Sequence, residues 1–141
     1  AYSLFTQHKK FIEVAKTDKF ISNYMKWIGH TEFGLKYIPI INNNLKNNND
    51  LDINHWIEQW YLTYNKVFQS LGKKPNVHFV SYEKLCLNKD YWFQIQKLVK
   101  IVKPYNFEFK ESIKDIPLNI EAGLKEKAFS LYLELNELNL L

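Results

Sequence analysis

The chain has 141 residues, enough for one domain with a hydrophobic core, and its 46% of hydrophobic residues is too high a share for intrinsic disorder. Its net charge of +4 comes entirely from lysine, because the sequence has no arginine, which excludes bidentate recognition of phosphate or guanine by a guanidinium. No apolar run approaches the roughly 18 residues of a membrane span. The single Cys86 cannot form an internal disulfide. These features predict a domain of the reducing cytoplasm that binds neither membranes nor nucleic acid.

The first part of the sequence predicts two short amphipathic helices. Apolar residues recur at helical spacing from the start of the chain to about Lys16, which indicates a first helix. Thr17 or Asp18 is suited to cap a second helix, and Gly29 is suited to end it. An irregular connection is expected after this glycine.

An asparagine-rich segment then predicts a polar, flexible loop over residues 42–53, because such residues favour turns over regular structure. The loop does not separate domains, so residues 1–141 are predicted to form a single domain portion. Asn54 is suited to cap a third helix that ends at Gly72. The apolar stripe of this helix consists of Trp56, Ile57, Trp60, Tyr61, Tyr64, Val67, Phe68 and Leu71.

One segment of the remaining sequence predicts a strand. Aromatic and β-branched residues follow a Pro-Asn turn, which is typical of a buried strand from Val77 to Ser81 or Tyr82. Asp90 is then suited to cap a helix that ends near Pro104, and Asn119 is suited to cap a last amphipathic helix.

A buried strand without neighbours leaves its backbone N–H and C=O groups unpaired on both edges. A helix before the strand and a helix after it are typical of a right-handed parallel βαβ sheet. We therefore expect an α/β fold of which this chain is the C-terminal half. In this interpretation the chain itself is mostly helical with one or two strands, and the other strands precede Ala1.

Three segments in this order resemble the bacterial branch of the sulfotransferase family. They are "AYSLFTQHKKF" with "YMKWIGHTEFG", then "WIEQWYLTYNKVF", then "NVHFVSYEKLC" with Trp92 following. The resemblance covers the chain up to about Val102 and, more weakly, the last helix. It implies a P-loop-like sulfotransferase fold and transfer of a sulfuryl group from 3'-phosphoadenosine 5'-phosphosulfate to a hydroxyl or amine of a small molecule or glycan.

The same resemblance implies nucleotide contacts for two residues. Ser3 matches a serine at a helix start that helps hold the 3'-phosphate, where free N–H groups favour an anion. Tyr82, in "SYEKL", matches a tyrosine that packs on or near the adenine. The alternatives are that Ser3 is a surface residue and that Tyr82 covers the core. No catalytic residue is assigned, because the family's phosphosulfate loop would precede Ala1, and the chain alone is expected to be inactive.

The histidines predict no catalytic or metal site. His8 shares a helix face with apolar residues, which favours a core histidine with satisfied hydrogen bonds. His30 follows Gly29 at a helix C-terminus, where the helix dipole accounts for it. No pair of histidines has metal-ligand spacing with a carboxylate nearby, so no metal is expected.

The sequence leaves two alternatives to the sulfotransferase. A non-enzymatic helical interaction module would bind a partner helix through an exposed aromatic patch and would have no affinity for the nucleotide. A lysine-rich nucleic-acid binder would show binding that depends steeply on salt. The modest charge and the lack of arginine disfavour the second of these functions.

Overall fold

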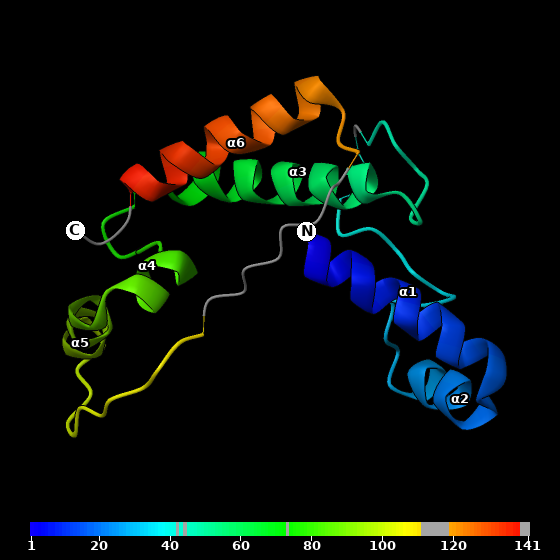
Figure 1. Ribbon diagram of the computed structural model, residues 1–141, viewed down its shortest axis with the longest axis horizontal. Helices are drawn as coiled ribbons and strands as arrows, with labels where there is room; N and C mark the ends of the chain where they lie inside the picture. The colour runs from blue at the N-terminus through cyan, green and yellow to red at the C-terminus, as the bar shows by residue number, and fades with distance from the viewer. Residues whose placement is uncertain (42, 44, 73, 111–118, 139–141) are drawn as a thin grey trace.

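The computed structural model describes residues 1–41, 43, 45–72, 74–110 and 119–138. Helices α3 and α6 pack along each other, and two arms extend from them, so the described chain has the outline of an arch (Figure 1). One arm consists of α1 and α2, and the other consists of α4 and α5. The bounds of the helices are α1 (Tyr2–Thr17), α2 (Lys19–Trp27), α3 (Ile53–Leu71), α4 (Tyr82–Leu87), α5 (Lys89–Leu98) and α6 (Ala122–Glu137).

The predicted α/β fold is wrong, because the described residues form no sheet. The segment predicted as a strand is extended, but among the described residues it has a single bridge position, Phe79. Ser81 ends the segment, because its hydroxyl accepts the N–H of Lys84 at 3.3 Å as the N-cap of α4. The N–H of Ser81 donates to the hydroxyl of Tyr91 at 3.4 Å. The described residues thus give this segment one bridge position and a side-chain hydrogen bond at its end, in place of the ladder that the prediction required.

The strand-like sequence pattern has a different cause in the structure. Val77 and Phe79 are half-buried, whereas His78 and Val80 are exposed. An extended segment with one side on helices shows the same period of two as a strand with one buried face. The parallel sheet was predicted because a buried strand would have lacked partners. Since this segment does not form such a strand, that reason for a sheet no longer holds.

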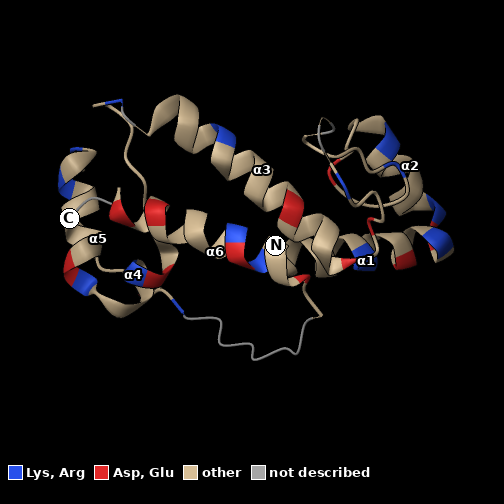
Figure 2. Cartoon of the chain, turned by 90° about the horizontal axis from the view of Figure 1, so that it is seen from above, with Lys and Arg blue, Asp and Glu red and all other residues tan. Residues whose placement is uncertain are grey.

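The core lies along α3, which contacts both α6 and α1. Trp56 of α3 packs in the interior, as do Leu131 and Leu135 of α6. Charged residues are sparse along α3, where Glu58 and Lys66 are the only ones (Figure 2). Burial on two sides explains this composition, because an unpaired charge is costly to remove from water.

Capping side chains fix several helix starts, but not always the predicted ones. Asp18 caps α2 as predicted and accepts the N–H groups of Phe20 and Ile21. Asn54 belongs to the first turn of α3 and does not cap it. Its Oδ1 accepts the N–H of Glu121 at 2.9 Å, and this bond joins the starts of α3 and α6. The N-cap positions are Asp52, Asn88 and Glu121 instead of the predicted Asn54, Asp90 and Asn119, and the side chain of Glu121 makes no capping hydrogen bond.

The end of α2 is a Schellman motif centred on Gly29, as the sequence predicted. Gly29 has a φ of 64°, and its N–H donates to the carbonyl of Lys26 at 3.2 Å. The next N–H, of His30, donates to the carbonyl of Met25 at 3.0 Å. These bonds satisfy the last carbonyls of the helix and set the direction of the following chain.

The same motif ends α5 with a lysine at the left-handed position. Lys100 has a φ of 58°, and the N–H of Ile101 donates to the carbonyl of Gln96 at 2.9 Å. The helix therefore ends at Leu98, well before the predicted end near Pro104. The Cβ of a non-glycine residue makes this conformation unfavourable.

Adding a Cβ at Gly29 and removing the side chain of Lys100 should change the stability of the chain in opposite directions. Gly29→Ala should lower the free energy of unfolding by about 1 kcal/mol, because a Cβ is disfavoured at positive φ, although no atom lies within 4 Å of it. Lys100→Gly should raise it by up to about 1 kcal/mol. Urea unfolding followed by circular dichroism measures both changes.

Gly123→Ala is the control, because Gly123 lies in the first turn of α6 and a Cβ there meets nothing within 4 Å. This variant should be more stable than the parent chain, because alanine favours a helix over glycine. An unchanged or increased stability of Gly29→Ala would contradict the role of the left-handed turn.

Candidate functional site

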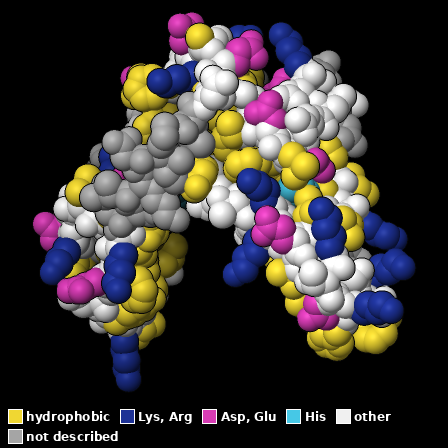
Figure 3. Space-filling model, turned by 45° about the vertical axis from the view of Figure 1, so that its right-hand side comes forward, with side chains coloured by type: hydrophobic (Ala, Val, Ile, Leu, Met, Phe, Trp, Pro, Cys, Tyr) yellow, Lys and Arg dark blue, Asp and Glu magenta, His cyan; other side chains and the backbone are white. Residues whose placement is uncertain are grey.

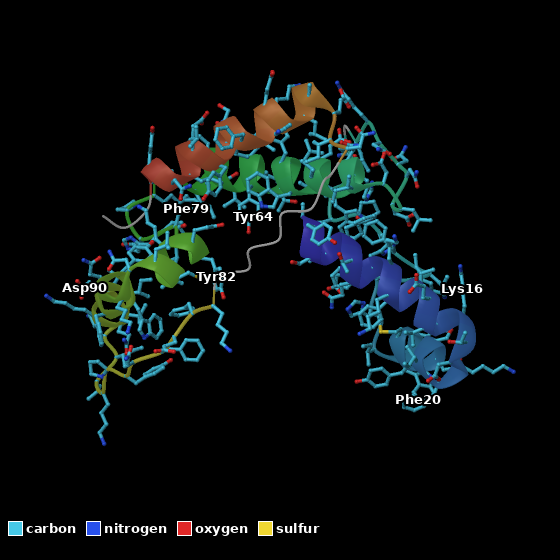
Figure 4. The ribbon with its side chains drawn as sticks, viewed as in Figure 1. Lys16, Phe20, Tyr64, Phe79, Tyr82 and Asp90 are labelled. Carbon is cyan, nitrogen blue, oxygen red and sulfur yellow. The ribbon has the colours of Figure 1, made fainter. Side chains whose placement is uncertain are left out.

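Tyr82 is the first residue of α4 and lines a cavity of about 230 Å³ bounded by α3, α4 and α6. Figure 4 shows Tyr64, Phe79 and Tyr82 near one another below α3 and α6. Leucine, valine and three polar residues complete a wall that is mainly aromatic. The aromatic residues of this Tyr82 cavity are Trp60, Tyr64, Phe79, Tyr82 and Tyr132.

The local structure fixes the position of Tyr82 while leaving 51% of its surface exposed. Its hydroxyl donates to the carbonyl of Lys110 at 3.1 Å, and its ring meets that of Phe109 edge to face, with centroids 6.0 Å apart. Desolvation and the nearby Cys86 raise the pKa of Tyr82 above its usual value. The side chain is therefore a neutral hydrogen-bond donor to Lys110, and half of the residue's surface is open to solvent.

The chemistry of the Tyr82 cavity favours a flat aromatic group over a phosphate. Trp60 and Tyr64 lie one turn apart on α3, with ring centroids 4.9 Å apart, and aromatic rings of this kind stack on nucleic-acid bases. Glu83 also lines the cavity, and its negative charge disfavours a phosphate at that position. The lining of the cavity thus suits a flat, uncharged aromatic group better than an anion.

Ser3 lies on the other arm. It is an exposed residue in the first turn of α1, and α1 makes no direct packing contact with α4 in the described chain (Figure 1). The structure therefore does not bring Ser3 and Tyr82 together. Their joint contact with one nucleotide stays a prediction.

His8 lies in the core, as predicted, beside Trp56 and Tyr37. Its Nδ1 accepts the N–H of Gly34 at 3.2 Å, so the proton of the neutral ring is on Nε2. That nitrogen is 3.4 Å from a carboxylate oxygen of Asp50, but it lacks the geometry of a hydrogen bond. Only one ring nitrogen of His8 is therefore satisfied.

Tyr37, which is half-buried, and the buried His55 form a pair that the sequence did not predict. The Nδ1 of His55 donates to the carbonyl of Asn47 at 2.7 Å, so its Nε2 accepts the hydroxyl of Tyr37 at 2.8 Å. Desolvation, together with the charge of Asp50, raises the pKa of Tyr37 to about 12. The hydroxyl therefore stays protonated, and its hydrogen bond to His55 links the segment that follows α2 to helix α3. No sequence spacing signals this pair, because Tyr37 lies in an irregular segment.

No family model, curated protein or solved structure matches the chain. Within the described ranges, no cluster of histidine, cysteine and acidic residues is arranged to hold a metal ion. None of the described helices has both the length and the apolar character to cross a membrane. The strongest guide to function is thus the Tyr82 cavity, together with the role that the resemblance assigns to Tyr82.

Burial of His8 should make the chain less stable in mild acid. Desolvation lowers the pKa of His8 from its ordinary 6.5, against the opposing charge of Asp50. The unfolded chain then binds more protons than the folded chain between the two pKa values, so stability rises with pH up to about pH 6.5. The free energy of unfolding should therefore fall from about pH 7 to about pH 5.

His8→Asn should reduce this pH dependence, because its amide oxygen can still accept the N–H of Gly34 without titrating. His78→Asn is the matched control, since His78 is exposed, and it should keep the slope of the parent chain. Urea unfolding at several pH values measures the slopes. Equal slopes for all three chains would contradict the account of His8.

Proposed function

We propose that the chain supplies the adenine-binding part of a sulfotransferase that uses 3'-phosphoadenosine 5'-phosphosulfate. The observation that supports this proposal is the position of Tyr82, the residue that the resemblance assigns to adenine, in an aromatic cavity. Benzene occupies an apolar cavity of about 150 Å³ in another protein. The Tyr82 cavity, at about 230 Å³, therefore has room for the two fused rings of adenine.

In the proposed reaction the acceptor is a hydroxyl or amine, whose oxygen or nitrogen attacks sulfur. The new bond to sulfur forms as the bond between sulfur and the phosphate oxygen breaks, and 3'-phosphoadenosine 5'-phosphate leaves with the electron pair. A base takes the acceptor's proton, but no described residue is assigned this role. We place the activity in the cytoplasm, where the free thiol of Cys86 stays reduced.

Ser3 is proposed to contact the 3'-phosphate through its hydroxyl and the first turn of α1. This contact requires the nucleotide to extend from the Tyr82 cavity toward the other arm. The two residues are therefore tested separately, because Tyr82 can bind the base even if Ser3 makes no contact with phosphate.

Tyr82→Ala should weaken binding of adenosine 3',5'-bisphosphate at least about fivefold, as expected for the loss of one base-stacking ring. Titration calorimetry with the whole chain measures the affinity. Tyr24→Ala is the matched control, because Tyr24 on α2 is 48% exposed and Tyr82 is 51% exposed. Ser3→Ala is compared in the same way with the exposed Ser70→Ala.

The control variants should bind like the parent chain. An equal affinity of Tyr82→Ala and the parent chain would contradict the adenine assignment. An equal affinity of Ser3→Ala and the parent chain would remove only the phosphate contact. Circular dichroism shows whether each variant keeps its helix content.

A helical interaction module is the second candidate function, and the surface of α2 favours it. Phe20 and Trp27 are 67% and 78% exposed, and Figure 3 shows hydrophobic side chains gathered at the free end of the arm that holds α1 and α2. Lys19 and Lys26 lie on the same short helix, so the partner proposed here is an amphipathic helix with acidic residues. This function predicts no affinity of the parent chain for adenosine 3',5'-bisphosphate.

A further inference from the structure

Helix α2 exposes a stripe of three aromatic residues with positive charge beside it. Phe20, Tyr24 and Trp27 lie at intervals of four and three residues, so they share one face of the helix, and all three are exposed. The rings of Phe20 and Tyr24 stack, with centroids 6.1 Å apart. Lys19 and Lys26 are also exposed, and their spacing places both on one flank of these rings. This α2 stripe therefore combines apolar area with two positive charges.

Helix α6 presents the opposite charge beside exposed apolar residues. One side of the helix packs along α3, and Phe129 and Leu133 on its outer side are 59% and 48% exposed. Glu137 lies one turn beyond Leu133 on the same face, Glu134 lies at the edge of that face, and both are exposed. The lysines of this helix all precede Phe129. The α6 surface formed by these four residues is therefore apolar with a negative edge.

The α2 stripe and the α6 surface are complementary but do not meet within one chain. Helix α2 packs on α1 at the free end of one arm, whereas α6 packs on α3 along the top of the arch (Figure 1). The two helices make no direct packing contact with each other in the described chain. The ion pairs between described residues involve other side chains, and Asp18, next to α2, is engaged by two N–H groups of that helix. A second copy of the chain supplies each surface with matching charge and matching apolar residues.

We propose that the α2 stripe of one copy packs on the α6 surface of another copy, with the two lysines of α2 beside Glu134 and Glu137. This contact names the partner of the interaction module, the second candidate function, and rests on that function. Each copy carries both surfaces, so two such contacts form in a closed two-fold dimer. The charged residues of both surfaces then gain partners, and the exposed rings of α2 are removed from water.

Two variants with reversed charges test the contact by sedimentation velocity of the whole chain over a range of concentrations. One variant carries Lys19→Glu and Lys26→Glu on α2. The other carries Glu134→Lys and Glu137→Lys on α6. Each variant alone should associate at least about tenfold more weakly than the parent chain, because like charges then face each other. An equimolar mixture should associate like the parent chain, because each variant offers the charge that the other requires.

The matched control combines Lys89→Glu with Lys97→Glu, which makes the same change of net charge on exposed residues of α5. This control should associate like the parent chain. Association of the unaltered chain should also weaken as the salt concentration rises, because salt screens charges at the surface. This last measurement needs no variant, so misfolding of a variant does not affect it.

A parent chain that is monomeric at every concentration, or a mixture that associates no better than either variant alone, would overturn the proposal. An equal loss of association in the control would also overturn it, since the change of net charge would then explain the loss. A monomeric parent chain would leave the interaction module itself standing. Binding of adenosine 3',5'-bisphosphate, titrated separately, would instead count against that module.

Discussion

Polar side chains on one face of α3 hold the irregular segment that precedes this helix. Gln59 bonds both backbone groups of Ile41, at 3.1 and 2.7 Å. Glu58 accepts the N–H of Asn47 at 3.0 Å, and His55 donates to the carbonyl of the same residue at 2.7 Å. A segment without secondary structure must find partners for its buried backbone, and buried polar side chains must find partners of their own. The backbone groups of the segment and the polar side chains of α3 therefore satisfy each other's hydrogen bonds. These bonds fix the connection between α2 and α3.

The arm that holds α1 and α2 depends on this connection. Gly34 in the connection donates to His8, and a Cβ at Gly34 would lie 3.6 Å from that of Phe11, so the chain passes close to α1. Tyr37 bonds His55 of α3. The connection thereby places Phe33 next to Phe11, with ring centroids 6.1 Å apart. The Tyr82 cavity depends instead on the packing of α6 against α3.

Apolar spacing predicted the long helices, because their burial on one face is a property of the local sequence. Apolar spacing did not predict the structure where contacts between residues far apart in the sequence determine it. The strand pattern at residues 77–80 reflects an alternation of half-buried and exposed side chains in a segment without a sheet. The left-handed turn at Lys100, which follows the end of α5 at Leu98, has no sequence signal, since lysine rarely adopts a positive φ. The resemblance supplied Tyr82, but the sequence did not predict that Tyr132 shares its cavity, because this position depends on the contact between α3 and α6.

Amide hydrogen exchange of Ile41 and Asn47 tests the role of α3 most directly. Both N–H groups lie outside any helix, yet the bonds to Gln59 and Glu58 should make them exchange much more slowly than in an unstructured peptide. Gln59→Leu should speed the exchange at Ile41 and leave Asn47 protected by Glu58. Exchange of both amides at the rate of an unstructured peptide in the unaltered chain would contradict the account.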